Sequence, residues 1–187
     1  METKTVYFAK PGTGNTSVAL RIAKARAEEL GIKTILVAST TGSTAVKAAK
    51  VLAGMRVIAV SHSAGHLEAN TQEFTEENKR VAENKGVIVL TTTHVFGGIS
   101  RAMRNQFKMY LLGETIANTL RFFGQGMKVA VEISIMAADA GLVRTDEDVI
   151  SIAGTARGAD TVILLTPVNS TRLFSLKIKE ILCKPRF

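Results

Sequence analysis

Cysteine is nearly absent from this chain of 187 residues: Cys183 is the only one, which excludes a disulfide framework. Disulfides are mostly confined to oxidising compartments, so we expect a reducing, cytoplasmic location. The opening residues, METKTVYFAK, lack the apolar core of a secretory signal, and no apolar run approaches the length of a membrane span. We therefore expect no membrane partner.

Aromatic residues are also scarce, because tryptophan is absent and Tyr7 and Tyr110 are the only tyrosines. A net charge of +8 would suit a nucleic-acid partner, yet the basic residues are spread over 21–26, 101–108 and 171–179 without interleaved aromatics. Nucleic-acid binding is therefore our third hypothesis for function. With 46% apolar and 21% charged residues, the composition predicts one globular domain over 1–187.

Short β-branched runs alternate with amphipathic segments along the chain. The pattern predicts strands over 4–10, 33–39, 55–61, 86–93, 127–135 and 160–167. It predicts helices over 15–31, 43–54, 75–86 and 145–158, and a pair of helices within 98–124. The final segment, 177–187, has the pattern of an edge strand with charged residues. Such alternation predicts an α/β fold, in which a three-layer, mostly parallel sheet of about six strands carries helices on both faces.

The stretch VASTTGSTA, residues 37–45, crowds hydroxyl side chains around one glycine, between a predicted strand and a predicted helix. Ligands of such sheets bind outside the carboxyl ends of the strands, and the free amides of a helix N-terminus bind anions. Gly42 would let the backbone approach an anion closely, and the hydroxyls would donate to phosphate oxygens. The alternative is a simple helix N-cap, for which one hydroxyl suffices. The stretch predicts a phosphate site made by Ser39, Thr40, Thr41, Gly42, Ser43 and Thr44.

A second glycine-rich loop, KPGTGNTS, follows the first predicted strand. It lacks the Gly-Lys-Ser/Thr of a P-loop, and the third glycine and the acidic residue of a dinucleotide fingerprint are missing as well. Together with its strand and helix, this loop resembles the first phosphate loop of flavodoxin, which wraps the phosphate of flavin mononucleotide (FMN). Lys10 and Pro11 depart from that pattern. The resemblance implies a cofactor contact for the matching residues Thr13, Gly14, Asn15 and Thr16, and we add Lys10 and Gly12 of the same loop.

From about residue 15 onward, the chain resembles the C-terminal α/β domain of pyruvate kinase. The order helix, strand, loop, helix, strand over 15–63 matches that domain, and VASTTGSTA matches its loop for an effector sugar phosphate. Through YFAKPG, VEISIMAADAG, RGADT and IKEILCKPR, the whole length is similar to stand-alone archaeal proteins of the pyruvate kinase α/β-domain-like group. That resemblance implies FMN as the cofactor and no established reaction. The catalytic barrel of pyruvate kinase has no counterpart in the sequence, so kinase activity is not implied.

Two histidines follow predicted strands and are candidates for contact with the rest of the ligand. His62 ends the third predicted strand, and His94 follows TTT at the end of the fourth. An imidazole in either place is suited to stack on a ring, to hydrogen-bond it, or to act as acid or base. The three histidines and one cysteine of the chain show no metal-ligand spacing, so we expect no metal site.

Two carboxylates belong to the same candidate set. Glu132 stands inside the apolar run 127–135, where a carboxylate needs a partner. That partner is either a ligand group or, alternatively, Lys128 or Arg157 in a salt bridge. Asp139 precedes Gly141 and is a candidate ligand contact, with a turn or cap as the alternative.

The sequence therefore predicts a protein that binds a phosphorylated ligand, with FMN as the cofactor. A flavin-dependent redox enzyme of unknown substrate is the first extension of this hypothesis. A non-catalytic sensor or regulatory module for a sugar phosphate is the alternative, and a homo-oligomer stays open. Because the aromatic pair that encloses the flavin in flavodoxins is lacking, the ring would contact aliphatic side chains, His62 or His94, Phe96 and backbone groups.

Overall fold

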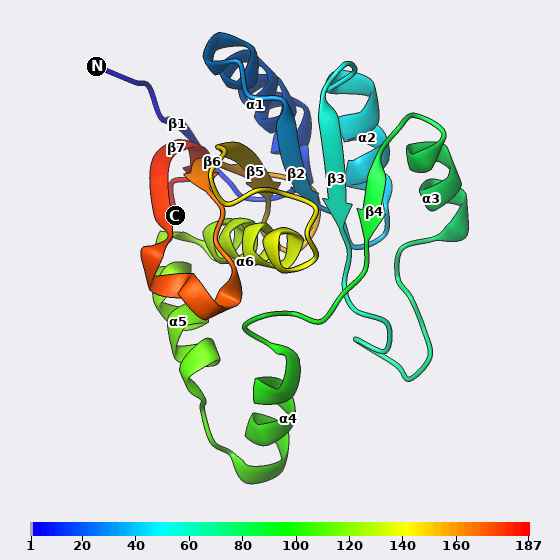
Figure 1. Ribbon diagram of the computed structural model, residues 1–187, viewed down its shortest axis with the longest axis vertical. Coiled ribbons are helices and arrows are strands. Elements are labelled where there is room, and N and C mark those ends of the chain that lie inside the picture. The colour runs from blue at the N-terminus through cyan, green and yellow to red at the C-terminus, as the bar shows by residue number, and fades with distance from the viewer. Residues whose placement is uncertain (1) are drawn as a thin grey trace.

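The computed structural model describes residues 2–187 and contains one seven-stranded sheet with helices on both faces (Figure 1). The strands are β1 (Val6–Phe8), β2 (Thr34–Ala38), β3 (Arg56–Val60), β4 (Ile88–Leu90), β5 (Val149–Ala153), β6 (Thr161–Thr166) and β7 (Lys177–Pro185). The α-helices are α1 (Thr16–Leu30), α2 (Ser43–Val51), α3 (Glu76–Glu83), α4 (Gly98–Phe107), α5 (Leu112–Leu120) and α6 (Gln125–Asp139). Three short 3₁₀ turns are η1 (Thr13–Asn15), η2 (Arg121–Phe123) and η3 (Ser170–Ser175).

The strands lie in the order β1-β7-β6-β5-β2-β3-β4. All neighbours are parallel except the two pairs that β6 makes with β5 and β7. The sheet is therefore mostly parallel, as predicted, with β6 running against the rest.

The residues of each central strand alternate between two apolar cores. Ile35 and Val37 of β2 pack with α1 and α2, whereas Leu36 between them packs with α6 on the opposite face. All three side chains are fully buried, which is the pattern of a strand covered on both sides. The predicted three-layer α/β architecture is thus confirmed.

The prediction of an edge strand over 177–187 holds for the first part of β7 and is wrong for its end, because β1 pairs only with Cys183–Pro185 and residues 177–182 pair with β6 alone. β7 pairs with β1 on one side and β6 on the other. Its charged residues have partners: Lys179 Nζ donates to Asp148 Oδ1 at 2.6 Å, and Glu180 accepts from Arg26 Nε at 2.9 Å. The charges that suggested an exposed edge therefore form ion pairs with neighbouring elements.

The segment 127–135 belongs to helix α6, so the strand predicted there is wrong. Residues 126–138 are buried except Val129. The helix therefore has no solvent-exposed polar face, and its sequence does not show the 3.6-residue period of an amphipathic helix. A short apolar run of this kind does not distinguish a buried helix from a buried strand. Lys128 and Glu132, four residues apart, form an ion pair on this helix, and their spacing was the helical signal in the sequence.

The segment 145–158 contains strand β5, so the helix predicted there is also wrong. The five residues Val149–Ala153 are all buried between β2 and β6. The acidic residues that resembled a helix N-terminus lie in the preceding loop, where Asp146 accepts a bond of 2.8 Å from Arg144 Nε and Asp148 accepts one of 2.6 Å from Thr166. Three β-branched residues within five favour the strand.

Helix α4 and the turn after it project away from the sheet and carry much exposed apolar surface (Figure 1). Ile99, Phe107, Tyr110 and Leu112 are each more than half exposed. Exposed apolar side chains can take part in self-association, which stays a prediction. None of the helices in residues 2–187 combines the length and apolar character needed to span a bilayer.

Candidate functional site

A cavity of about 460 Å³ opens where β2, β3 and β5 end, and α6 forms one of its walls. From β2 the chain continues to β3 on one side, and it returns later to β5 on the other side. Such a reversal point at the carboxyl ends of parallel strands is the usual ligand site of open α/β sheets. The volume lies in the range of small-molecule sites.

The hydroxyl-rich loop 39–44 forms one wall of this cavity. Gly42 is the N-cap residue of α2, and Ser39 Oγ takes over the bonding part of a cap by accepting a hydrogen bond of 3.2 Å from the Ala45 amide in the first turn. Within residues 2–187, the five backbone amides of 40–44 donate to no protein acceptor. Thr40, Thr41, Ser43 and Thr44 also line the cavity, which places their hydroxyls beside those free donors. The cap explanation therefore accounts for Ser39 alone.

Gly42 does not line the cavity, which corrects the role expected for it. Its φ of 91° is in the left-handed region, and an added Cβ would lie 2.5 Å from Phe74 Cε1 and from Asn78 Cβ. Asn78 Nδ2 also donates to the Thr41 carbonyl at 2.8 Å. Glycine is required here so that the loop can turn and pack against the segment before α3, not so that a ligand can approach.

A Gly42→Ala variant is expected to unfold at lower denaturant than a Gly54→Ala variant. Both glycines have a similar positive φ, 91° and 87°, but a Cβ on Gly54 would meet no atom within 4 Å. The backbone strain of about 1–2 kcal/mol is therefore common to both, and the clash is added only at Gly42. Urea denaturation of the two variants measures the difference. Equal losses would show that the loop relaxes freely around residue 42.

The loop 10–16 does not line the cavity, and its hydrogen bonds are made within the fold. Asn15 Nδ2 donates to the Lys10 carbonyl at 2.8 Å, and the Gly12 amide donates to Asp160 Oδ2 at 2.9 Å. The buried Thr16 hydroxyl donates to the Thr13 carbonyl at 2.9 Å and accepts from the Ala159 amide at 3.0 Å. Gly12, Thr13 and Thr16 therefore support the loop 154–158 and the residues after it from behind, and Gly158 of that loop does line the cavity. Lys10, Gly14 and Asn15 belong to the same loop 10–16, outside the cavity lining.

All three histidines of the chain meet at the cavity, although His94 is distant from His62 and His66 in the sequence. The ring centroids of His62 and His66 are 4.0 Å apart, and that of His94 lies 5.3 and 5.0 Å from them. β3 and β4 are parallel neighbours, so the residues that follow them emerge side by side, linked by a 2.7 Å bond between the Ser61 and Thr91 hydroxyls. Metal ligands were sought in the sequence by their spacing along the chain, and this cluster was not recognised in that way.

Glu132 is 2% exposed and lies on the cavity wall formed by α6. It pairs with Lys128 and accepts a bond of 3.2 Å from the Phe96 amide. Burial alone would raise the pKa of this carboxyl, but the contact with His94 and the Lys128 charge outweigh it and hold the pKa at about 2. Of the two salt-bridge partners considered, the structure therefore selects Lys128 rather than Arg157.

His94 presents an unpaired nitrogen in this wall. Its Nδ1 lies 3.5 Å from Glu132 Oε2, whereas Nε2 is buried and has no hydrogen-bond partner within residues 2–187. A neutral imidazole that carries its proton on Nδ1, towards the carboxylate, leaves Nε2 as an acceptor. A buried acceptor without a partner is costly, so this atom is suited to bind a donor of a ligand.

Four cationic side chains line the cavity against two carboxylates, Glu73 and Glu132. Arg157 makes no salt bridge within residues 2–187. The excess of positive charge favours an anionic ligand. The four are Arg101, Arg121, Lys128 and Arg157.

Asp139 lies outside the main cavity, in a neighbouring depression that it shares with His94 and Met136. Its Oδ1 accepts bonds of 3.0 Å from the Ser170 amide and 3.3 Å from Asn169 Nδ2. Burial alone would raise the pKa of the Asp139 carboxyl, but the hydrogen bonds from Ser170 and Asn169 have the larger effect, so its pKa is lowered. Asp139 therefore ties the C-terminal end of α6 to the start of η3, a contact between distant segments and not the local turn beside Gly141 that was the alternative considered.

Among the charged and imidazole side chains of the cavity, four were not singled out from the sequence: His66, Glu73, Arg101 and Arg121. Glu73 reaches His62 because the loop after β3 folds back on itself. The contact of 2.5 Å between His62 Nδ1 and Glu73 Oε2 joins the two ends of this loop. The two arginines come from α4 and η2. SHSAGH, with two histidines four residues apart after a strand, was the one available signal.

A comparison with protein families matches residues 17–165 to the model described as "Pyruvate kinase, alpha/beta domain". Among solved structures, a pyruvate kinase from Cryptosporidium parvum is 15% identical, with a TM-score of 0.43 over 85% of this chain and 24% of that one. C. parvum pyruvate kinase in complex with ADP is 14% identical, with a TM-score of 0.40 over 89% and 23%. The chain thus spans about a quarter of the length of these pyruvate kinases.

Proposed function

The chain belongs to the pyruvate kinase alpha/beta domain family, and on that premise we propose that it binds a phosphorylated small molecule in the cavity described above. The observation that carries the proposal is the run of backbone amides 40–44, which have no protein acceptor within residues 2–187 and four of which belong to residues that line the cavity at the start of α2: Thr40, Thr41, Ser43 and Thr44. Amides in this position bind phosphate through hydrogen bonds and through the helix dipole. Arg157, which makes no salt bridge within residues 2–187, supplies a positive charge to the lining of the same cavity.

We propose FMN as this ligand. The hydroxyls and amides of 39–44 would hold its phosphate, and His62, His94 and Glu132 would contact the remainder. The unpaired Nε2 of His94 fits an N–H donor of the flavin ring, and the buried Glu132 fits hydroxyl donors. FMN supplies one- and two-electron transfer when it is bound, so a redox role with an unidentified substrate is the extension of this proposal.

A sugar phosphate is the second candidate, and the composition of the lining favours it. No phenylalanine or tyrosine is among the described residues that line the cavity, so a flavin ring would pack against imidazole rings and aliphatic side chains. A polyhydroxy ligand would instead use the hydroxyl, arginine and carboxylate groups that dominate the wall. In that case the protein would be a sensor or regulatory module rather than a redox enzyme.

Calorimetric titration with FMN, riboflavin and a sugar bisphosphate separates these candidates. Riboflavin is FMN without its phosphate, so the proposed site should bind FMN at least about 100-fold more tightly, as expected from two or more charge-assisted bonds. The flavin absorption band of the untreated protein is the companion measurement. Equal affinity for FMN and riboflavin would contradict the phosphate site, and binding of the sugar bisphosphate alone would replace FMN with the second candidate.

A further inference from the structure

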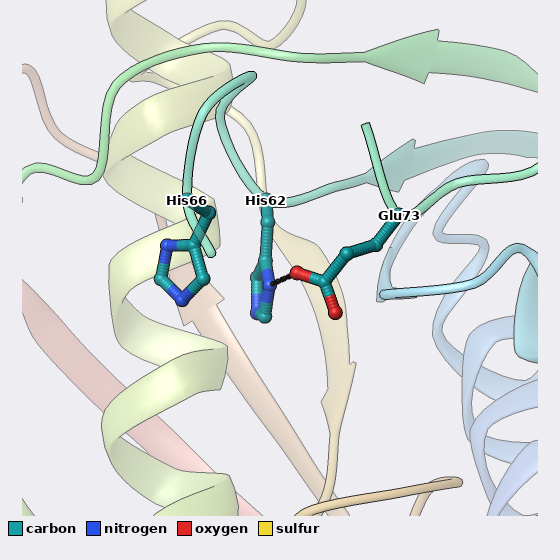
Figure 2. A group of neighbouring side chains, drawn as sticks. All are labelled: His62, His66 and Glu73. Atoms are coloured by element: carbon teal, nitrogen blue, oxygen red, sulfur yellow. Dashed lines mark hydrogen bonds and ion pairs between the residues drawn. The ribbon is translucent and has the colours of Figure 1, made fainter. Parts of the chain in front are cut away.

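His62, His66 and Glu73 converge on the mouth of the cavity from a single loop, 61–75 (Figure 2). One ligand atom of each lies within 4.8 Å of the others. Figure 2 shows the His62 ring beside that of His66, with the Glu73 carboxylate reaching His62 from the other side. We propose that these three side chains form a binding site for one divalent transition-metal ion, with Zn²⁺ as the ion that fits best.

The donor set matches what zinc prefers. Two imidazoles and one carboxylate are an established zinc ligand set, with the fourth position left to water or substrate. The His62 Nδ1–Glu73 Oε2 contact of 2.5 Å must open before both atoms can bind the same ion, and a proton held on Nδ1 would have to move to Nε2 of the same ring.

The loop must close slightly to bind the ion. Ligand atoms around tetrahedral zinc are about 3.3 Å apart, given bonds of about 2.0–2.1 Å, so the spacing of up to 4.8 Å has to shrink. His62, His66 and Glu73 all lie in irregular structure between β3 and α3, and none is fully buried. Closure therefore needs side-chain rotation and loop movement without disturbing the sheet.

Arg101 opposes metal binding in this arrangement. Its Nη1 lies 3.3 and 3.2 Å from the two ring nitrogens of His66, and it brings a positive charge beside the site. Glu73 is the one carboxylate of the cluster itself, and Glu132 faces His94 on the cavity wall behind it. Removing the guanidinium should therefore tighten metal binding by on the order of 10-fold, whereas removing a ligand should weaken it.

The test is calorimetric titration of the untagged, chelator-treated chain with Zn²⁺ alone in phosphate-free buffer. We expect one ion per chain, and at least about 100-fold weaker binding by His66→Ala and Glu73→Gln, since even outer contacts of zinc sites are worth 10- to 100-fold. Glu68→Gln, in the same loop but outside the cluster, is the matched control and should bind as the parent does. Competing sites are few, because the three histidines are all in the cavity and Cys183 is buried.

Absence of saturable one-to-one binding, or binding unchanged in both ligand variants, would overturn the proposal. Circular dichroism checks that the variants fold. If one of them does not, Arg101→Gln decides, because it removes no ligand: tighter Zn²⁺ binding supports the site, and unchanged or weaker binding refutes it. The probe is the metal alone, and the amides of 40–44 supply none of its ligands, so failure here is distinct from failure of the proposed phosphate site.

Discussion

A Glu132→Gln variant is expected to lose about 3 kcal/mol or more of unfolding free energy, because it leaves the Lys128 ammonium buried without its counter-charge. Glu132 is 2% exposed and Lys128 7%, so water replaces little of the lost interaction. The glutamine oxygen can still accept from the Phe96 amide, which confines the change to the charge. Urea denaturation followed by circular dichroism measures the loss.

The matched control is the double variant Lys128→Met/Glu132→Gln. Replacing both members of a buried ion pair by neutral groups of similar size is often neutral, whereas breaking the pair is costly. The double variant should therefore recover most of the stability lost by Glu132→Gln. If the double variant is as unstable as the single one, the pair does not account for the loss.

The same carboxylate gives the parent protein a defined acid sensitivity. Its pKa is about 2 in the folded chain against 4.5 as the ordinary value, so the unfolded chain binds more protons between these pH values. The contribution of Glu132 is fully present above pH 4.5 and is lost as the pH falls towards 2. The stability difference between the parent and Glu132→Gln should shrink through that window, and a constant difference would contradict the assigned pKa.

A Ser43→Asp variant is expected to weaken FMN binding by about 10- to 100-fold while leaving the fold as stable as before or more so. Ser43 is exposed, opens α2 and lines the cavity, so an aspartate there would face a bound phosphate and repel it. The same negative charge at a helix N-terminus stabilises the helix by about 0.3–1 kcal/mol. Binding and stability therefore change in opposite directions, which a merely damaged loop would not produce.

Ser43→Asn, the neutral counterpart of Ser43→Asp, controls for the change of shape and should bind FMN nearly as the parent does. Calorimetry gives the two affinities, and thermal denaturation gives the two stabilities. Equal weakening by aspartate and asparagine would remove the electrostatic argument for a phosphate at this helix. Unchanged affinity in both variants would place the ligand elsewhere.

Much of the fold was predictable from the sequence, and the failures have a common cause. Strands such as 33–39 and helices such as 15–31 were recognisable because glycine or hydroxyl residues mark their ends and their periods differ. The segment of α6 was predicted as a strand and the segment of β5 as a helix, because both elements are buried on nearly every side and neither shows a polar face. The position of β7 between β1 and β6 depends on pairing across the sheet, which no local pattern records.

The candidate site was predictable only in part. The loop 39–44 was found because its excess of hydroxyls exceeds what a cap needs, and it lines the cavity. The loop 10–16 has a similar composition but lies behind 154–158, since a glycine and hydroxyl pattern does not reveal which way the backbone amides point. His66 and Glu73 escaped because their proximity to His62 arises from the return of a long loop.

The most direct test of the phosphate site follows the backbone amides of isotopically labelled protein by NMR during titration with FMN. The account predicts saturable shifts at the amides of 40–44, with riboflavin producing none of comparable size at the same concentration. Shifts confined to 10–16, or no saturable change at 40–44, would contradict it.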